Sequence, residues 1–369
     1  MNNNSILLLG GYGAVGRTFA RLLLNETEAE IIIAGRRKEK ADAFAAKLKN
    51  EFPSRTISSS YANASEPDSL RIAFRGVNLI IVLTTTPQFI KQIGKAALEE
   101  NCDYLDILVS ETTIKDLAEF APLIKEKNRI FITQAGFHPG LPAVFVRFGA
   151  QYFDVYKKAV IAMAMNARFE TSEQAAEIVP LITEFKTEIY QNGSWRKTTY
   201  KDAIKLSMGK RFGVKSLFPI QMDEIKLTQK MFNLEETGVY VSGFNWVTDY
   251  FVMPIILLTQ KIKKGLAINF ILKLFTWSVN KFSSPYQGVV FLNEAEGTKN
   301  GKKIKVRISA EHDDAYLFTA IPVIACLKQY LAGSLPFGLS MMGHAVNEKQ
   351  LFADMEKMGV EIKIEMEES

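Results

Sequence analysis

Apolar residues in the first third of the chain occur in short runs, separated by segments with the spacing of amphipathic helices. The runs predict buried strands, and their alternation with helices is typical of a doubly wound parallel sheet. The expected strands are 6–9, 31–34, 55–61, 79–83, 104–108 and 130–134, and the expected helices begin near 17 and span 38–50, 68–75, 88–101 and 113–127. We therefore predict an α/β domain of Rossmann type over residues 1–140.

From residue 141 onward, apolar and polar residues alternate within short segments, which is typical of antiparallel strands. Asn192-Gly193 and Asn300-Gly301 each separate two such strands, and Asn-Gly is a strong signal for a tight hairpin turn. An apolar helix is expected over 315–333, with Gly333 as its C-terminal cap. These features predict a second α+β domain with a mixed or antiparallel sheet over 141–314. A C-terminal helix and strand are expected over 315–369.

The first apolar run leads directly into Gly10-Gly11-Tyr12-Gly13-Ala14-Val15-Gly16, which contains the spacing G-x-G-x-x-G. In dinucleotide-binding domains the first glycine permits a sharp turn, the second lets the backbone approach the pyrophosphate, and the third lets the helix pack closely. The helix N-terminus then supplies free N–H groups to the anion. A plain structural turn is the alternative. The position directly after the first strand favours a dinucleotide site.

The second expected strand ends at Gly35-Arg36-Arg37-Lys38, where an NAD-binding domain has an acidic residue on the ribose 2′-hydroxyl. No acid occurs at that strand end, and an arginine there can bind a 2′-phosphate through two hydrogen bonds and stack on adenine. A solvated basic turn is the alternative interpretation. We predict NADP(H) as the cofactor, with Gly35, Arg36 and Arg37 among its contacts.

Composition limits the other classes of function. The formal net charge of the 369 residues is only +5, which does not indicate nucleic-acid binding. Cys102 and Cys326 have no metal-type spacing, and the three histidines are scattered, so we expect no metal site and a reduced compartment. No apolar run reaches the roughly 20 residues that span a bilayer, and no signal peptide is recognised. We expect a soluble cytoplasmic protein with a small-molecule substrate.

Residues after the later strands are further candidates, because ligands of doubly wound sheets bind at the carboxyl ends of the strands. Thr84, Thr85 and Thr86 could contact the nicotinamide ribose or cap the next helix. Asp106 lies at the end of an apolar strand. Its carboxylate is either a structural hydrogen-bond acceptor or an acid/base group near the substrate. His138, in a turn rich in glycine and proline, is the other acid/base candidate; otherwise it only stabilises the turn.

These motifs together resemble the saccharopine dehydrogenase family in its broad sense. The resemblance is carried by 10–16, Ala34-Gly35-Arg36, Asn63-Ala64-Ser65, Tyr104-Leu105-Asp106 and Gly136-Phe137-His138-Pro139-Gly140, and by Thr319-Ala320-Ile321-Pro322 with Gly333 and Gly343. It implies an NAD(P)-binding domain with cofactor contacts at Asn63 and Ala64. It also implies a second domain whose sheet is used for homodimerisation, and a C-terminal segment that returns to the first domain. The family often has an acid where this chain has Asn63.

The resemblance implies hydride transfer to or from a C=N or C=O carbon of a small amino-acid-derived substrate. Two alternatives remain, a reductase of a lipid-like substrate and a non-catalytic NADP-sensing protein. The first is suggested by the segment 244–282, which is dense in apolar residues and contains five lysines and one acid. Ile268, Phe270, Ile271, Leu274, Phe275 and Trp277 fall on one broad helical face there. This face could contact a membrane surface or a lipid, or form a core or a dimer interface.

Overall fold

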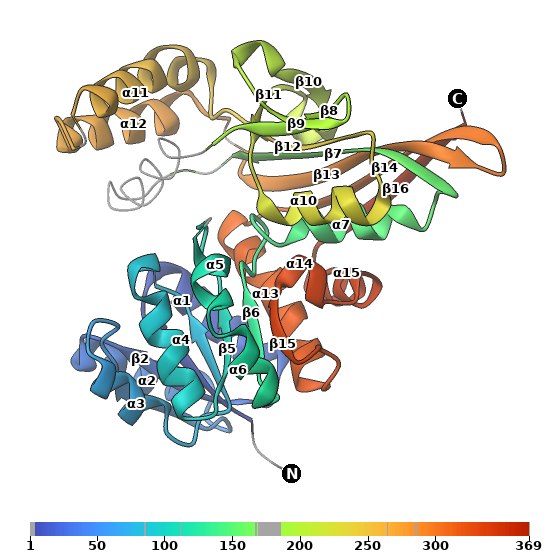
Figure 1. Ribbon diagram of the computed structural model, residues 1–369. Helices are drawn as coiled ribbons and strands as arrows, with labels where there is room; N and C mark the ends of the chain where they lie inside the picture. Colours follow the sequence, from blue (N-terminus) through green and yellow to red (C-terminus); the bar gives the residue numbers. More distant parts are fainter. Residues whose placement is uncertain are drawn as a thin grey trace. The chain divides into compact units, whose positions relative to one another are not determined.

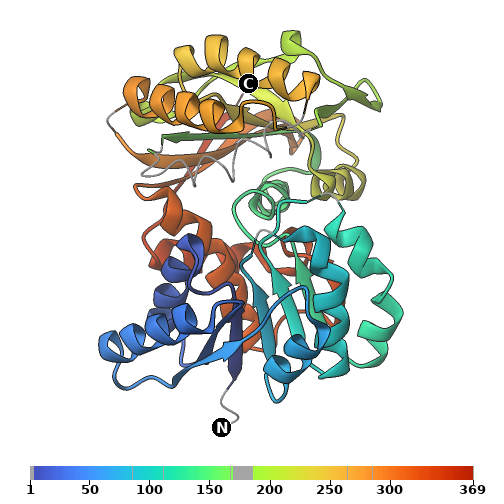
Figure 2. The ribbon, with the colours of Figure 1, turned by 90° about the vertical axis from the view of Figure 1, so that its left-hand side faces the viewer.

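The computed structural model describes residues 4–84, 86–110, 112–166, 168, 186–263, 265–284 and 286–368. The chain divides into two compact units, one of residues 1–144 and 316–358, the other of residues 145–315 and 359–369 (Figures 1 and 2). The polypeptide therefore leaves the first unit after Val144, builds most of the second, and returns at Tyr316.

Within the described residues, the first unit contains a seven-stranded sheet in the order β15-β6-β5-β4-β1-β2-β3. Every neighbouring pair is parallel. The strands are β1 (Ser5–Leu9), β2 (Glu30–Gly35), β3 (Ile57–Tyr61), β4 (Leu79–Val82), β5 (Asp103–Asp106), β6 (Ile130–Thr133) and β15 (Gly338–Met341). The prediction of a Rossmann-type parallel sheet is confirmed, with one strand added from a distant part of the chain.

Helices connect these strands and cover the sheet (Figure 2). Leu7 and Leu9 of β1 pack in one core cluster with Leu70 and Phe74 of α3. Because side chains alternate along a strand, Ile6, which is also fully buried, lies on the other face of the sheet. The helices are α1 (Ala14–Glu26), α2 (Lys38–Glu51), α3 (Pro67–Phe74), α4 (Ile90–Glu99), α5 (Thr113–Ala118), α6 (Ala121–Glu126), α13 (Ala315–Leu331), α14 (Met342–Ala345) and α15 (Glu348–Lys357), with a 3-10 turn at Pro87–Phe89.

One expected helix is wrong. The sequence pattern predicts a single helix over 113–127, but the structure has two, α5 and α6, separated at Glu119–Phe120. Pro122 lies in the first turn of α6, where its missing N–H is tolerated. In the interior of a continuous helix the same proline would remove a hydrogen bond, so a new helix starts there.

The second unit is built on a mixed sheet in the order β10-β11-β12-β7-β13-β14-β16, with β8 and β9 attached through β12. Its strands are β7 (Val155–Asn166), β8 (Glu188–Gln191), β9 (Ser194–Lys197), β10 (Ile204–Ser207), β11 (Val214–Ile220), β12 (Glu236–Ser242), β13 (Gly288–Lys299), β14 (Lys302–His312) and β16 (Glu361–Glu368). The pair β12/β7 is parallel, and the other pairs are antiparallel. The predicted second α+β domain is confirmed.

Both predicted hairpin turns are present. Asn192 and Gly193 connect β8 to β9, and Asn300 and Gly301 connect β13 to β14. All four residues have positive φ, between 51° and 78°. Asparagine and glycine tolerate this left-handed conformation better than other residues, which is why the pair marks such turns.

The helices of the second unit are α7 (Leu141–Ala150), which crosses from the first unit, α9 (Gly209–Phe212), α10 (Asp223–Phe232), α11 (Met253–Ile262) and α12 (Ile268–Phe282), with a π-helical turn at Thr248–Val252. The last strand, β16, pairs with β14 in this unit. The resemblance implied that the C-terminal segment returns to the first domain; α13, β15 and α15 do so, and β16 does not. Oppositely charged partners explain this pairing, since Lys305 faces Glu367 and Arg307 faces Glu365.

Candidate functional site

The predicted cofactor residues of the first unit gather at one edge of its sheet. Strand β1 lies between β2 and β4. The chain continues from β1 toward β2 and from β4 toward β5, which lie on opposite sides of the β1/β4 pair. Ligands of doubly wound sheets bind at such a switch point. The turn 10–16 follows β1, residues 35–37 follow β2, Asn63 follows β3, and Thr84 follows β4. Because all these strands are parallel, these segments lie at the carboxyl edge.

Backbone hydrogen bonds fix the glycine turn. Gly10 has a φ of 88° and donates its N–H to the carbonyl of Ala34 at 2.8 Å, which ties the turn to β2. A Cβ atom on Gly16 would lie 2.6 Å from the carbonyl oxygen of Gly10, and one on Gly10 would lie 2.5 Å from Cγ2 of Thr84. Both positions exclude a side chain, because the helix and the end of β4 approach the turn so closely.

The turn is open where a pyrophosphate would lie. Gly13 is the N-cap of α1, and within the described residues no side chain caps this helix and no acid lies in its first turn. A Cβ on Gly13 would meet only the carbonyl oxygen of Gly10, at 3.2 Å. The first N–H groups of α1, including those of Ala14 and Val15, are left for an anion. These residues fit a dinucleotide.

Tyr12 links this turn to the end of β2. Its ring lies against Gly35, where a Cβ atom would be 2.6 Å from a ring carbon. The Tyr12 hydroxyl accepts a hydrogen bond from the Arg37 N–H at 3.1 Å, and the Arg37 guanidinium lies 5.8 Å from the centre of the ring. The sequence indicated Tyr12 only as a cofactor contact. Its role in positioning 35–37 is seen only in the structure.

The three cations after β2 have different surroundings. Lys38 forms an ion pair with Asp42, and Arg37 lies over Tyr12. Arg36 is exposed, and among the described residues it forms no hydrogen bond or ion pair. A guanidinium without a protein partner at the end of the second strand is available to an anionic ligand.

The other predicted cofactor residues shape the same edge. The Asn63 amide donates to Glu66 at 2.7 Å, and its carbonyl oxygen accepts from the Ser65 N–H at 3.2 Å, so this side chain holds its own loop. The carbonyl of Ala64 accepts from the Gln92 amide at 2.7 Å. The hydroxyl oxygens of Thr84 and Thr86 lie 2.7 Å apart. Thr85 lies outside the described residues.

Asp106 is completely buried at the end of β5 and accepts four hydrogen bonds. One carboxylate oxygen accepts from the Tyr104 hydroxyl at 2.8 Å and the Thr133 hydroxyl at 2.7 Å. The other accepts from the N–H groups of Leu108 and Gln134, each at 3.0 Å. Burial raises the pKa of Asp106, although its four donors act in the opposite direction. This environment favours the structural interpretation, since all four acceptor contacts are used within the protein and those from Thr133 and Gln134 hold β5 to the end of β6.

His138 lies in the turn that follows β6. Gly136 and Gly140 have φ values of 153° and 118°, and the Leu141 N–H donates to the Gly136 carbonyl at 3.2 Å. A Cβ on Gly140 would lie 2.5 Å from that same carbonyl oxygen, so the turn requires glycine. The Nε2 atom of His138 is shielded from solvent, and burial lowers the pKa of the imidazole to about 4. The ring is therefore neutral at pH 7.

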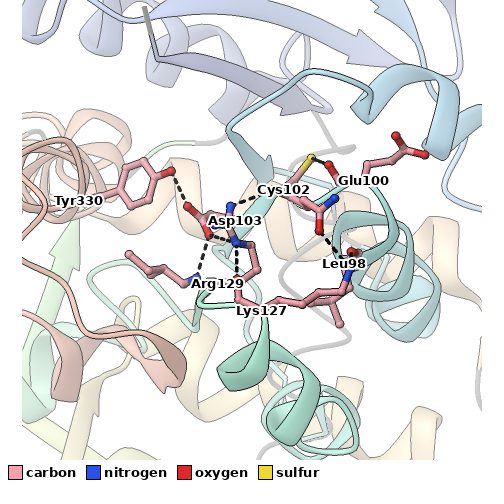
Figure 3. Close-up of polar contacts among 9 residues, drawn as sticks. Leu98, Glu100, Cys102, Asp103, Lys127, Arg129 and Tyr330 are labelled. Atoms are coloured by element: carbon pink, nitrogen blue, oxygen red, sulfur yellow. Dashed lines mark hydrogen bonds and ion pairs between the residues drawn. The ribbon is translucent and has the colours of Figure 1, made fainter. Parts of the chain in front are cut away.

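A second polar cluster lies at the opposite edge of the sheet, where β5 begins (Figure 3). The Asp103 carboxylate accepts from the Tyr330 hydroxyl of α13 at 2.8 Å and from the Ile130 N–H at 2.8 Å. The Arg129 guanidinium lies 3.8 Å from the same carboxylate and donates to the carbonyl of Asn101. No sequence motif indicated this cluster, which attaches α13 to the edge of the sheet opposite the glycine turn. Among the described residues no group of histidine, cysteine and acidic side chains could hold a metal ion.

Comparisons with known proteins agree with this geometry. Residues 6–131 match the family described as saccharopine dehydrogenase NADP binding domain. The fold is similar to that of apo saccharopine dehydrogenase (L-Glu forming) from Saccharomyces cerevisiae, with a TM-score of 0.70, 13% identity, and coverage of 99% of this chain and 100% of that chain. Biliverdin reductase from Synechocystis, in complex with biliverdin and NADP⁺, has a TM-score of 0.41 and 11% identity over 96% of each chain. No curated protein sequence matches this chain.

The family match extends from β1 into β6, so it includes the glycine turn and the segments 35–37 and 63–64. The yeast enzyme shares the fold over nearly the whole chain, including the second unit. The predicted fold class is thus confirmed, the predicted family resemblance is supported over residues 6–131, and a nicotinamide cofactor is supported. The N-terminal third of this chain therefore matches the saccharopine dehydrogenase NADP binding domain, and the chain as a whole has the fold of a saccharopine dehydrogenase.

Proposed function

We propose that this protein uses NADP(H) to transfer a hydride to or from a C=N or C=O carbon of a small amino-acid-derived substrate. The position and surroundings of Arg36 are the observation that favours NADP(H) over NAD(H). Arg36 has an exposed guanidinium without a protein partner among the described residues, at the strand end where an NAD-binding domain has a carboxylate. A carboxylate there would repel a 2′-phosphate, whereas a guanidinium binds it with charge-assisted hydrogen bonds.

The chain's own residues divide the work between binding and proton transfer. The N–H groups at the start of α1 bind the pyrophosphate, Arg36 binds the 2′-phosphate, and Thr84 and Thr86 lie on the nicotinamide side of the switch point. The bound nicotinamide supplies the hydride chemistry. We assign acid/base work to His138, because it lies in the turn that follows β6, at the carboxyl edge of the sheet. In the oxidative direction it accepts the proton that leaves the substrate's O–H or N–H.

Replacement of Arg36 by aspartate tests the cofactor assignment. Losing the charge-assisted hydrogen bonds and adding a like charge is expected to raise the dissociation constant of NADPH about 100-fold, and that of NADH less than about threefold. Both constants are measured by fluorescence titration of the purified protein. Arg75→Asp is the control, because Arg75 is 76% exposed and follows α3 rather than β2. Equal losses for NADPH and NADH in the Arg36 variant would refute the assignment.

The substrate class is tested separately. A panel of keto acids with amines, followed by NADPH oxidation, should include a substrate whose turnover falls at least 100-fold in His138→Asn while NADPH affinity is kept. Turnover of apolar carbonyl compounds alone would instead favour a reductase of lipid-like substrates. Tight NADPH binding without turnover on either panel would favour a non-catalytic NADP sensor.

A further inference from the structure

The helical pair α11 and α12 of the second unit forms a small subdomain with a core of its own (Figure 1). Val252, Ile256, Ile271, Phe275 and Val279 are buried together in one cluster. The hydroxyl of Thr248 also donates to that of Ser278 at 2.9 Å within this buried region. The pair is therefore held together from inside. Phe244, Met253, Leu272 and Leu274 are partly buried and pack against this cluster.

Other apolar residues of 244–282 face outward. Besides Tyr250, six of them are between 51% and 69% exposed: Trp246, Phe251, Leu258, Ile262, Phe270 and Trp277. The sequence pattern placed Phe270 and Trp277 on one face with Ile271 and Phe275, but only the last two are buried. The ring centres of Trp246 and Phe251 are 6.0 Å apart, and the Phe282 ring lies 6.2 Å from Trp246 and 5.4 Å from Trp277. Scattered exposed apolar residues are ordinary, whereas contiguous exposed rings that include two tryptophans mark a surface that binds something. We call these six residues the apolar face.

The charges around the apolar face have one sign. Lys261, Lys263, Lys273 and Lys281 are exposed, and none of them forms an ion pair within the described residues. At 100° per residue, Lys273 and Lys281 lie on the same side of α12 as Phe270 and Trp277. The acid of this segment, Asp249, turns away from solvent: its carboxylate accepts from the Phe244 N–H at 2.9 Å. The face is thus apolar with a cationic rim.

This combination selects among possible occupants. In a two-fold homodimer the same patch meets itself, so the cationic rims of two copies would repel each other. A small lipid-like substrate needs a concave pocket, whereas these side chains are exposed on α11, on α12 and on the segment 246–251 before them. An anionic bilayer surface satisfies both features, because aromatic rings enter the headgroup region and lysines reach the phosphates. No helix among the described residues is long and apolar enough to cross a membrane.

We propose that the apolar face of α11 and α12 docks this protein on an anionic lipid bilayer, lying in the interface without crossing it. The occupant is the bilayer surface itself, recognised through phosphate headgroups and the apolar boundary beneath them. The surface lies in the second unit, whereas the cofactor residues lie in the first. The proposal does not depend on the identity of the cofactor or the substrate.

Co-sedimentation of the full chain with vesicles tests the proposal. The wild type should sediment with vesicles of phosphatidylcholine and phosphatidylglycerol and much less with phosphatidylcholine alone. Lys273→Gln/Lys281→Gln should lower the partition coefficient roughly fivefold for each lysine neutralised. The matched control is Lys303→Gln/Lys349→Gln, which removes two exposed lysines outside this segment and should bind as the wild type does.

The apolar contribution has its own variant and control. Phe270→Ser/Trp277→Ser should lower vesicle binding more than about tenfold. Phe337→Ser should not, although Phe337 is 63% exposed, as Phe270 is. Thermal unfolding and NADPH binding should be unchanged in both, because the replaced side chains are exposed and outside the cofactor site. A Trp195→Phe background leaves Trp246 and Trp277 as the tryptophans, and brominated lipids should quench their fluorescence.

Three outcomes would overturn the proposal. The wild type could stay in the supernatant with anionic vesicles at low salt. The serine double variant could bind vesicles as well as the wild type does. Sedimentation velocity could also show a wild-type dimer that Phe270→Ser/Trp277→Ser converts to a monomer without any vesicle binding, which would assign the face to a second copy of the chain. None of these outcomes alters the NADPH titrations, so the cofactor proposal stands or falls separately.

Discussion

Replacing Asp106 with asparagine should destabilise the first unit rather than act only on turnover. Asparagine has the same size, but one of its two polar atoms is a donor. The residue is completely buried, so no water compensates for a lost acceptor. The amide oxygen can keep the N–H donors of Leu108 and Gln134, which leaves the amide nitrogen facing the hydroxyls of Tyr104 and Thr133.

The magnitude follows from these four contacts. A hydrogen bond to a charged group contributes about 1 kcal/mol more than one between neutral groups, so four of them amount to about 4 kcal/mol. The variant no longer buries a charge, and this gain offsets part of the loss, as the raised pKa of Asp106 indicates. The expected net loss in the free energy of unfolding is about 2 kcal/mol. Asp106→Ala should lose about 4 kcal/mol or more, because it leaves four buried donors without an acceptor.

Urea unfolding at pH 7, followed by circular dichroism and by NADPH fluorescence, measures both effects. Asp116→Asn is the matched control: its carboxylate is 30% exposed and lies 3.7 Å from Lys91, so its loss should cost less than about 0.5 kcal/mol. A normal urea midpoint in Asp106→Asn, together with lost turnover and intact NADPH binding, would refute the structural role and restore the catalytic one.

Three further predictions concern other parts of the first unit. Burial lowers the pKa of His138 to about 4, so below pH 6.5 the unfolded chain binds a proton that the folded chain does not. The free energy of unfolding should therefore fall by about 2 kcal/mol between pH 7 and pH 5, as measured by urea titrations at the two pH values. The His138→Asn variant should lack this pH-dependent loss. Gly16→Ala puts a Cβ atom 2.6 Å from the Gly10 carbonyl oxygen, so NADPH affinity should fall at least tenfold by titration. Gly76→Ala, which strains a residue with a φ of 76° outside the cofactor turn, should lower stability but bind NADPH normally. Tyr330→Phe removes a donor to Asp103 and should cost about 1–2 kcal/mol in urea unfolding with NADPH affinity unchanged; lost affinity would contradict the separation of the two edges.

Local chemistry decided how much of the fold could be predicted. The turns at Asn192-Gly193 and Asn300-Gly301 were predictable because few residues tolerate positive φ, and the glycine turn because its spacing is dictated by close backbone contacts. The break between α5 and α6 also had a local signal, Pro122, which the periodicity of 113–127 obscured. Such features depend on a few neighbouring residues.

Long-range pairings had no comparable signal. Nothing in 338–341 indicates that this segment joins β6, and the match of β16 to β14 depends on charges in two segments far apart in the sequence. At the candidate site, the sequence identified Arg36 but not that it has no partner among the described residues, while Asp42 pairs with Lys38 and Arg37 lies over Tyr12. The helical period of α12 likewise predicted an amphipathic segment without showing that Phe270 and Trp277 lie on its exposed side.

The position of β15 has a consequence for synthesis on the ribosome. Strand β6 ends at Thr133, and the strand that pairs with its outer side begins at Gly338. At 5–20 residues per second, the roughly 200 residues between them take roughly 10–40 s to emerge. During that time the nascent sheet has an open edge at β6, with unpaired N–H and C=O groups that another chain could extend. Strand β15 then becomes the edge of the sheet and is only half-buried at three of its four positions, whereas β6 is buried at all four. Nascent chains that stop before Gly338 therefore leave the more apolar strand at the open edge and should be the ones most prone to aggregation.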